Sequence, residues 1–165
     1  MRDMFVWIAP TPLYDLAISY AVCCFWHGHI YVNAELSPFQ VNGPDAQNYA
    51  AVMDMYANEG DPRDTFGQGG YRSARCFVDM MMGMDPVMVD DRAAVSDAIR
   101  GITGYTSDLM CGPYYVGDAD FHMPNHAGYM VRIVEGGFEI VRDCYEFDSP
   151  FFAPLIALEE ELGLR

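Results

Sequence analysis

The 165-residue chain is 52% hydrophobic and 14% aromatic, a composition that excludes an intrinsically disordered protein. It carries 24 acidic residues against nine arginines and no lysine, and the resulting formal charge of −15 argues against direct binding to nucleic acid or to anionic membranes. No apolar run approaches the ~20 residues that cross a bilayer. The nearest candidate, residues 16–26, lacks a basic flank and therefore predicts a core helix instead of a signal peptide.

The first third of the chain is expected to alternate strands and helices. Residues 3–10 predict a short strand, and residues 29–36 predict another. Residues 11–28 predict a helix, because threonine and proline open the segment and glycine follows its end. Residues 42–60 predict a second helix with a buried stripe at 3–4 spacing.

The middle of the chain predicts a glycine-rich loop followed by two helices. Residues 60–73 form the loop, and such loops often carry function. A methionine-rich helix is expected near residues 73–82, and another helix from about residue 90 to residue 102. The methionines are interpreted as adaptable core filling.

The last third changes to a strand pattern. Residues 128–134 and 138–144 predict two strands joined by a two-residue loop at Gly136-Gly137, and residues 153–165 predict a closing helix. Helices first and an antiparallel sheet afterwards indicate an α+β fold, with N-terminal helices packed on a small sheet in a single domain, residues 1–165.

The five cysteines form an odd set without a CxxC pair. This pattern is typical neither of a disulfide framework nor of a zinc site. Reduced, mostly buried thiols in the cytoplasm are therefore expected, with no metal and no cofactor.

The segment HAGYMVRIVEGGFEIVRD runs from His126 to Asp143 as a histidine, two strands and an acid. Across about residues 125–145 it resembles the papain-like double-glycine leader peptidases. The resemblance implies a papain-like fold in which His126 is the general base and Asp143 orients it. A strict two-residue loop places His126 opposite Phe147, so a β-bulge is needed to bring the pair together, and Glu146 and Asp148 are rival acids.

The nucleophile is left open. Cys76 stands early in a helix beside two arginines, and Gln68 upstream is a candidate oxyanion donor. Cys111, in MCGPYY, ranks behind it because a strand-like segment follows. Asn42 stands where the family carries its cysteine, which implies a non-catalytic relative.

Two functions follow from these patterns. The favoured one is an acidic, non-enzymatic interaction protein, a phage-type or effector-type inhibitor that imitates a polyanion on the basic, nucleic-acid-binding surface of a host protein in the cytoplasm. The alternative is a cysteine hydrolase acting on an amide or thioester through Cys76, His126 and Asp143. A homodimer is compatible with both. The acidic residues expected to bind the basic partner are Asp90, Asp91, Asp118, Asp120, Glu146 and Asp148.

Overall fold

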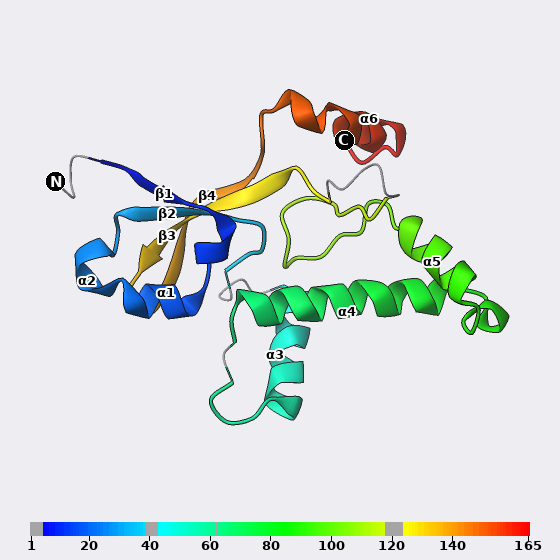
Figure 1. Ribbon diagram of the computed structural model, residues 1–165, viewed down its shortest axis with the longest axis horizontal. Coiled ribbons are helices and arrows are strands. Elements are labelled where there is room, and N and C mark those ends of the chain that lie inside the picture. The colour runs from blue at the N-terminus through cyan, green and yellow to red at the C-terminus, as the bar shows by residue number, and fades with distance from the viewer. Residues whose placement is uncertain (1–4, 39–42, 62, 118–123) are drawn as a thin grey trace.

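The computed structural model describes residues 5–38, 43–61, 63–117 and 124–165. Its sheet has four strands in the order β1-β2-β3-β4 (Figure 1). The strands are β1 (Trp7–Ala9), β2 (Ile30–Ala34), β3 (Ala127–Val134) and β4 (Gly137–Glu146). β1 pairs with β2 in parallel, and the other two pairs are antiparallel. The expected mixture of helices and strands is confirmed, but the sheet is mixed and not purely antiparallel.

The segment between β1 and β2 crosses over one face of the sheet as two short helices, α1 (Leu16–Ala21) and α2 (Cys23–Trp26). The single helix expected over residues 11–28 is wrong, because Asp15 begins α1 by accepting a hydrogen bond from the Ala17 amide at 2.8 Å. Thr11 opens only a 3-10 turn, η2 (Thr11–Leu13), and its hydroxyl donates to the Asn33 carbonyl at 2.9 Å. A βαβ crossover of this kind is what a parallel strand pair requires.

Three consecutive helices between β2 and β3 lie away from the sheet: α3 (Pro44–Tyr56), α4 (Thr65–Gly83) and α5 (Arg92–Arg100). Figure 1 shows α4 running from the sheet toward α5, with α3 against its first half. The glycine-rich loop predicted over residues 60–73 is largely helical, because the Asp64 carboxylate accepts a hydrogen bond from the Gly67 amide at 2.8 Å and starts α4 at Thr65. Helix α3 is capped from a distance: the Asp108 carboxylate accepts from the amides of Asp45 and Ala46.

The β3–β4 hairpin changes register along its length. Val134 pairs with Gly137, so Glu135 and Gly136 form the turn instead of the predicted Gly136-Gly137. Register irregularities then shift the pairing between Val131 and Gly128, and the amide of Phe147 donates to the His126 carbonyl at 2.8 Å. His126 therefore lies opposite Phe147, but through register shifts and not through the two-residue loop from which this position was expected.

The core lies between the sheet and α1, where Val32, Val131 and Ile133 are fully buried. The Tyr14 and Phe138 rings meet edge to face there, with centroids 4.5 Å apart. The remaining elements are the 3-10 turns η3 (Pro86–Met88) and η4 (Pro150–Phe152) and the last helix, α6 (Ala153–Glu161). No helix in the described part of the chain is sufficiently long and apolar to span a bilayer.

Cys111 and Cys144 form a disulfide that joins the segment before residue 117 to β4, with their Cα atoms 5.4 Å apart. The expectation that all cysteines are reduced is therefore wrong. Spacing along the chain could not reveal this pair, because it is 33 residues apart and becomes adjacent only through the β3–β4 hairpin.

Candidate functional site

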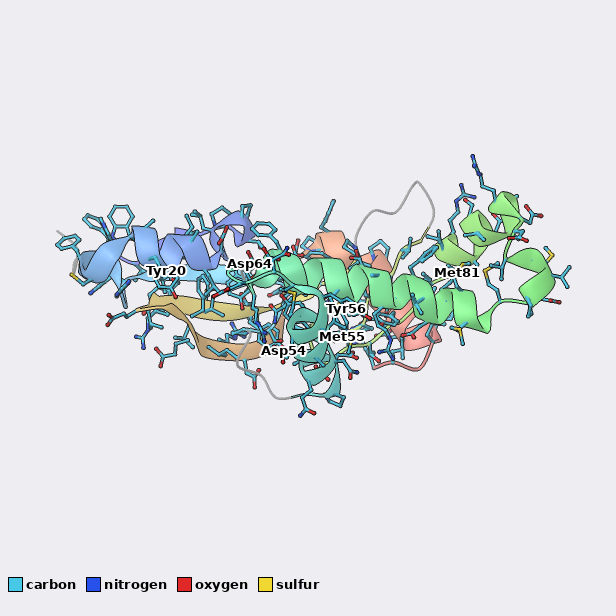
Figure 2. The ribbon with its side chains drawn as sticks, turned by 90° about the horizontal axis from the view of Figure 1, so that it is seen from below. Tyr20, Asp54, Met55, Tyr56, Asp64 and Met81 are labelled. Atoms are coloured by element: carbon cyan, nitrogen blue, oxygen red, sulfur yellow. A yellow bond between two sulfur atoms is a disulfide. The ribbon has the colours of Figure 1, made fainter. Side chains whose placement is uncertain are left out.

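A recess lies where the first turn of α4 meets the sheet and the start of α1. Figure 2 marks Asp64 at this end of α4 and Met81 toward the other end. We call the recess the polar pocket; it is lined by Tyr14, Leu16, Pro38, Arg63, Asp64, Thr65, Gln68 and Phe138. Its volume is about 20 Å³, which is room for little more than one water molecule. The described residues therefore leave no cavity here that could enclose a solute.

Gln68 is the most unusual side chain of the polar pocket. It is only 1% exposed, and its amide nitrogen has no hydrogen-bond partner among the described residues. Leaving such a donor buried and unpaired costs about 1–3 kcal/mol. A carboxylate or carbonyl oxygen of a ligand entering the recess would remove that cost.

The neighbours of Gln68 are already held in place. Asp64 is fixed as the cap of α4, and Arg63 forms an ion pair with Asp54 of α3. The Thr65 side chain hydrogen-bonds to Tyr14, whose pKa burial raises well above its usual range. Tyr14 is therefore a neutral hydroxyl at any physiological pH. The recess combines fixed hydrogen-bonding groups with the buried rings of Tyr14 and Phe138.

A second, larger cavity of about 230 Å³ lies between α4, α5 and the segment 102–116. We call it the apolar pocket; it is lined by Arg72, Ser73, Cys76, Phe77, Ile99, Ile102, Tyr105, Tyr114 and Val116. Burial raises the pKa of the Cys76 thiol, and nearby Arg72 only partly opposes this shift. Cys76 is therefore not an activated thiolate.

The residues predicted to form a catalytic triad are not brought together. His126 is buried at the start of β3, where its Nε2 lies 2.8 and 2.9 Å from the two carboxylate oxygens of Glu159 on α6. Asp143 is exposed on β4 and accepts a hydrogen bond from the Cys144 amide. No hydrogen bond or ion pair of the described residues joins any two of Cys76, His126 and Asp143.

The remaining predicted residues are scattered. Cys111 is committed to its disulfide, and Asn42 lies outside the described residues. Glu146 is exposed and pairs with Arg165, Asp91 caps α5, and Asp90 and Asp148 are exposed. Asp118 and Asp120 also lie outside the described residues.

Sequence reasoning identified Gln68 but gave it a different role, and it missed Tyr14, Asp64 and Thr65. The sequence did contain a signal for these residues: an aspartate followed by a threonine, Asp64-Thr65, is a typical helix start. It would have predicted that the helix begins near residue 65 instead of residue 73.

The chain matches a family model described as periplasmic binding protein over residues 25–137. It also resembles three solved structures. An ABC transporter substrate-binding protein from Aeropyrum pernix has a TM-score of 0.73 and 11% identity, over 88% of this chain and 38% of that one. A branched-chain amino acid ABC transporter protein from Thermus thermophilus, solved with bound valine, has a TM-score of 0.67 and 11% identity, over 90% of this chain and 40% of that one.

The third is a fatty acid ABC transporter substrate-binding protein from Thermomonospora curvata, with a TM-score of 0.63 and 17% identity, over 86% of this chain and 36% of that one. At these identities the likeness establishes the fold. The chain spans between 36% and 40% of the length of the three solved chains. No curated protein matches it.

These findings correct the interpretation of the sequence. The resemblance to papain-like leader peptidases is wrong, because the family model and all three structures belong to a different fold. The predicted functions, a polyanion-like inhibitor or a cysteine hydrolase, are wrong for the same reason. The expected basic protein partner is contradicted by the match to the periplasmic binding protein family. The cytoplasmic location is contradicted by a family of periplasmic proteins.

Proposed function

Because this chain belongs to the periplasmic binding protein family, we propose that it forms a ligand-binding lobe of a substrate-binding protein that serves an ABC transporter. The match over residues 25–137 includes α3, α4 and most of the polar pocket. All three similar structures are described as proteins of ABC transporters, and two of them are named for small organic solutes. A small organic solute is accordingly the proposed ligand class.

The polar pocket is the proposed contact of this lobe with the solute. The observation that carries this assignment is the buried Gln68 amide, whose nitrogen lacks a partner among the described residues. A buried polar group without a partner is rare in proteins and requires an explanation. An oxygen atom of the solute, held over the Tyr14 and Phe138 rings, supplies that partner.

A second lobe is proposed to cover the same face. The accessible surface of the chain is 10,215 Å². A compact monomer of its mass, 18.5 kDa, exposes only about 8,200 Å². The surplus of roughly 2,000 Å² exceeds the ~800 Å² that one partner buries in a standard interface.

Two exposed apolar residues are neighbours in sequence of residues that line the polar pocket. Leu13 precedes Tyr14 and Phe66 follows Thr65, and they are 37% and 63% exposed. Periplasmic binding proteins close two domains around their ligand by a hinge motion. In this proposal residues 1–165 form one unit, and the remainder of the binding protein closes against the polar pocket.

Thermal unfolding of the full chain in the presence of candidate solutes tests this function. We expect one class among amino acids and short-chain carboxylic acids to raise the midpoint, because a ligand that binds only the folded state stabilises it. Gln68→Leu should abolish that shift without lowering the stability of the free protein, since the variant removes an unpaired buried amide.

Gln47→Leu is the matched control, because Gln47 is an exposed glutamine on α3 and lies outside the pocket. It should leave the solute-induced shift unchanged. A folded chain that responds to no solute, or a shift that survives in Gln68→Leu, would contradict the proposal.

A further inference from the structure

The apolar pocket lies about one helical turn along α4 from the polar pocket, since Arg72 follows Gln68 by four residues. The two pockets share no lining residue. The apolar pocket measures about 230 Å³, roughly the volume that eight water molecules occupy in the liquid. This space suits a molecule of a few carbon atoms.

The walls of the apolar pocket are largely hydrocarbon. Phe77 of α4, Ile99 of α5 and Val116 form aliphatic and aromatic surface, and the rings of Tyr105 and Tyr114 complete it. Such walls favour an apolar body, because burying apolar surface contributes about 25 cal/mol per Å².

Arg72 is the one positively charged side chain in this lining. Its guanidinium stacks over the Tyr114 ring with its carbon 4.2 Å from the ring centroid, and its Nη1 donates to the Met110 sulfur at 2.9 Å. A thioether is a weak acceptor, and a guanidinium has five N–H donors. Among the described residues, most of the hydrogen-bonding capacity of Arg72 is therefore unused.

Arg72 is one of three described arginines, with Arg92 and Arg142, that form no ion pair with a described carboxylate, and of these three it alone lines the apolar pocket. With 24 acidic residues in the sequence, most arginines find carboxylates. Those that form an ion pair with a carboxylate are Arg63, Arg75, Arg100, Arg132 and Arg165. Arg72 has no carboxylate partner among the described residues. The nearby Asp79 is occupied, because it accepts hydrogen bonds from Arg75 and from the Tyr105 hydroxyl.

We propose that the apolar pocket is a second binding site, which takes a small monocarboxylate with an apolar tail through Arg72. The carboxylate accepts hydrogen bonds from the guanidinium, and the tail lies against Phe77, Ile99 and Val116. The cation is held in place by Tyr114, so little side-chain freedom is lost when the anion binds. The site is independent of the polar pocket and of the second lobe.

Cys76 supplies a reporter for this site, because it lines the apolar pocket and is a free, half-buried thiol. Hexanoate, titrated into the millimolar range, should slow alkylation of Cys76 by iodoacetamide, as followed by peptide mass spectrometry. Cys24, which is exposed on α2, is the internal control and should react at an unchanged rate. Hexan-1-ol and hexylamine share the tail and lack the carboxylate, so they should protect Cys76 far less.

Arg72→Met keeps most of the side-chain length and removes the charge. We expect it to weaken hexanoate protection by roughly ten- to a hundredfold, the equivalent of one lost charge-assisted hydrogen bond. Val116→Phe keeps Arg72 and fills the cavity, and it should abolish protection as well. Circular dichroism establishes that each variant is folded. Loss of protection in both variants would show that the effect does not come from a local distortion in only one of them.

Gln68→Leu separates this inference from the proposed function, because hexanoate should still protect Cys76 in that variant. Equal protection by hexan-1-ol, unchanged protection in Arg72→Met, or no protection in the folded wild-type chain would each overturn the second site, whatever the polar pocket binds.

Discussion

The His126 imidazole is clamped by both carboxylate oxygens of Glu159, at 2.8 and 2.9 Å from Nε2, with both side chains at most 3% exposed. The contact joins the start of β3 to α6, 33 residues later. Arg165 lies 3.8 Å from the same carboxylate and reinforces it. The sequence indicated His126 as a catalytic base. In the structure it instead holds the C-terminal helix α6 against the start of β3.

Removing one member of this pair should be costly. Glu159→Ala leaves a buried imidazole without its partner and should lower the free energy of unfolding by about 3–5 kcal/mol. The paired replacement of His126 and Glu159 by leucine should cost less, because neither member of the pair is then left buried without the other. Urea denaturation of the single and double variants measures the difference. If Glu159→Ala unfolds with the wild-type midpoint, the pair contributes nothing to holding α6.

The Cys111–Cys144 disulfide should contribute to stability through the loop that it closes. A cross-link spanning 33 residues lowers the conformational entropy of the unfolded chain. In the loop-entropy model this raises the free energy of unfolding by about 3–4 kcal/mol. Addition of a reductant should lower the urea midpoint of the wild-type chain accordingly. A Cys111→Ala and Cys144→Ala double variant should show no further effect of the reductant, and intact-mass measurement of the oxidised protein should show the loss of two hydrogens.

The parts of the fold that sequence predicted are those with local signals. The hairpin strands follow from alternation and turn residues, and α3 follows from Pro44 and its apolar spacing. The sequence analysis missed the start of α4 because Gly67, Gly69 and Gly70 favour a loop. In the structure the capping carboxylate of Asp64, together with tertiary contacts, overrides that preference.

The site depended on contacts that no local pattern encodes. Gln68 lies near Tyr14 and Phe138 only because the first turn of α4 lies beside the sheet and the start of α1. The pairing of His126 with Glu159 likewise needs α6 to lie against the residue that precedes β3. The order of His126, two strands and Asp143 suggested a catalytic pair. The same order also arises in a hairpin whose polar residues only pair with their neighbours or face the solvent.

Gly67 should be intolerant of a side chain. A Cβ there would overlap the hydroxyl of the buried Tyr49 on α3, so the Tyr49 side chain or the two helices would have to shift. Gly67→Ala should therefore lower the free energy of unfolding by about 1–3 kcal/mol. Gly70→Ala is the matched control on the same helix, because its Cβ meets nothing within 4 Å; it should raise stability by about 0.5–1 kcal/mol.

Thermal unfolding of both glycine variants decides between steric and helix-propensity effects. A second change, Tyr49→Phe in the Gly67→Ala background, removes the clashing oxygen and should recover part of the loss. Equal stabilisation by both alanines would show that α3 and α4 are not in contact at this point.

The protein should lose stability at alkaline pH through the partly buried Tyr105. Burial, followed by the charges of Asp79 and Asp45, raises the pKa of Tyr105 from 10 to about 12. Because the pKa of Tyr105 is higher in the folded state than in the unfolded state, the neutral phenol favours the folded state. Its contribution to stability is complete below pH 10 and is lost as the pH rises toward 12.

Tyr105→Phe cannot ionise and should make the fall in urea midpoint shallower over this interval. Tyr20→Phe controls for the loss of a hydroxyl, since its ring is 70% exposed, and its profile should follow that of the wild type. Parallel curves for all three proteins would mean that Tyr105 ionises as freely in the folded state as in the unfolded chain.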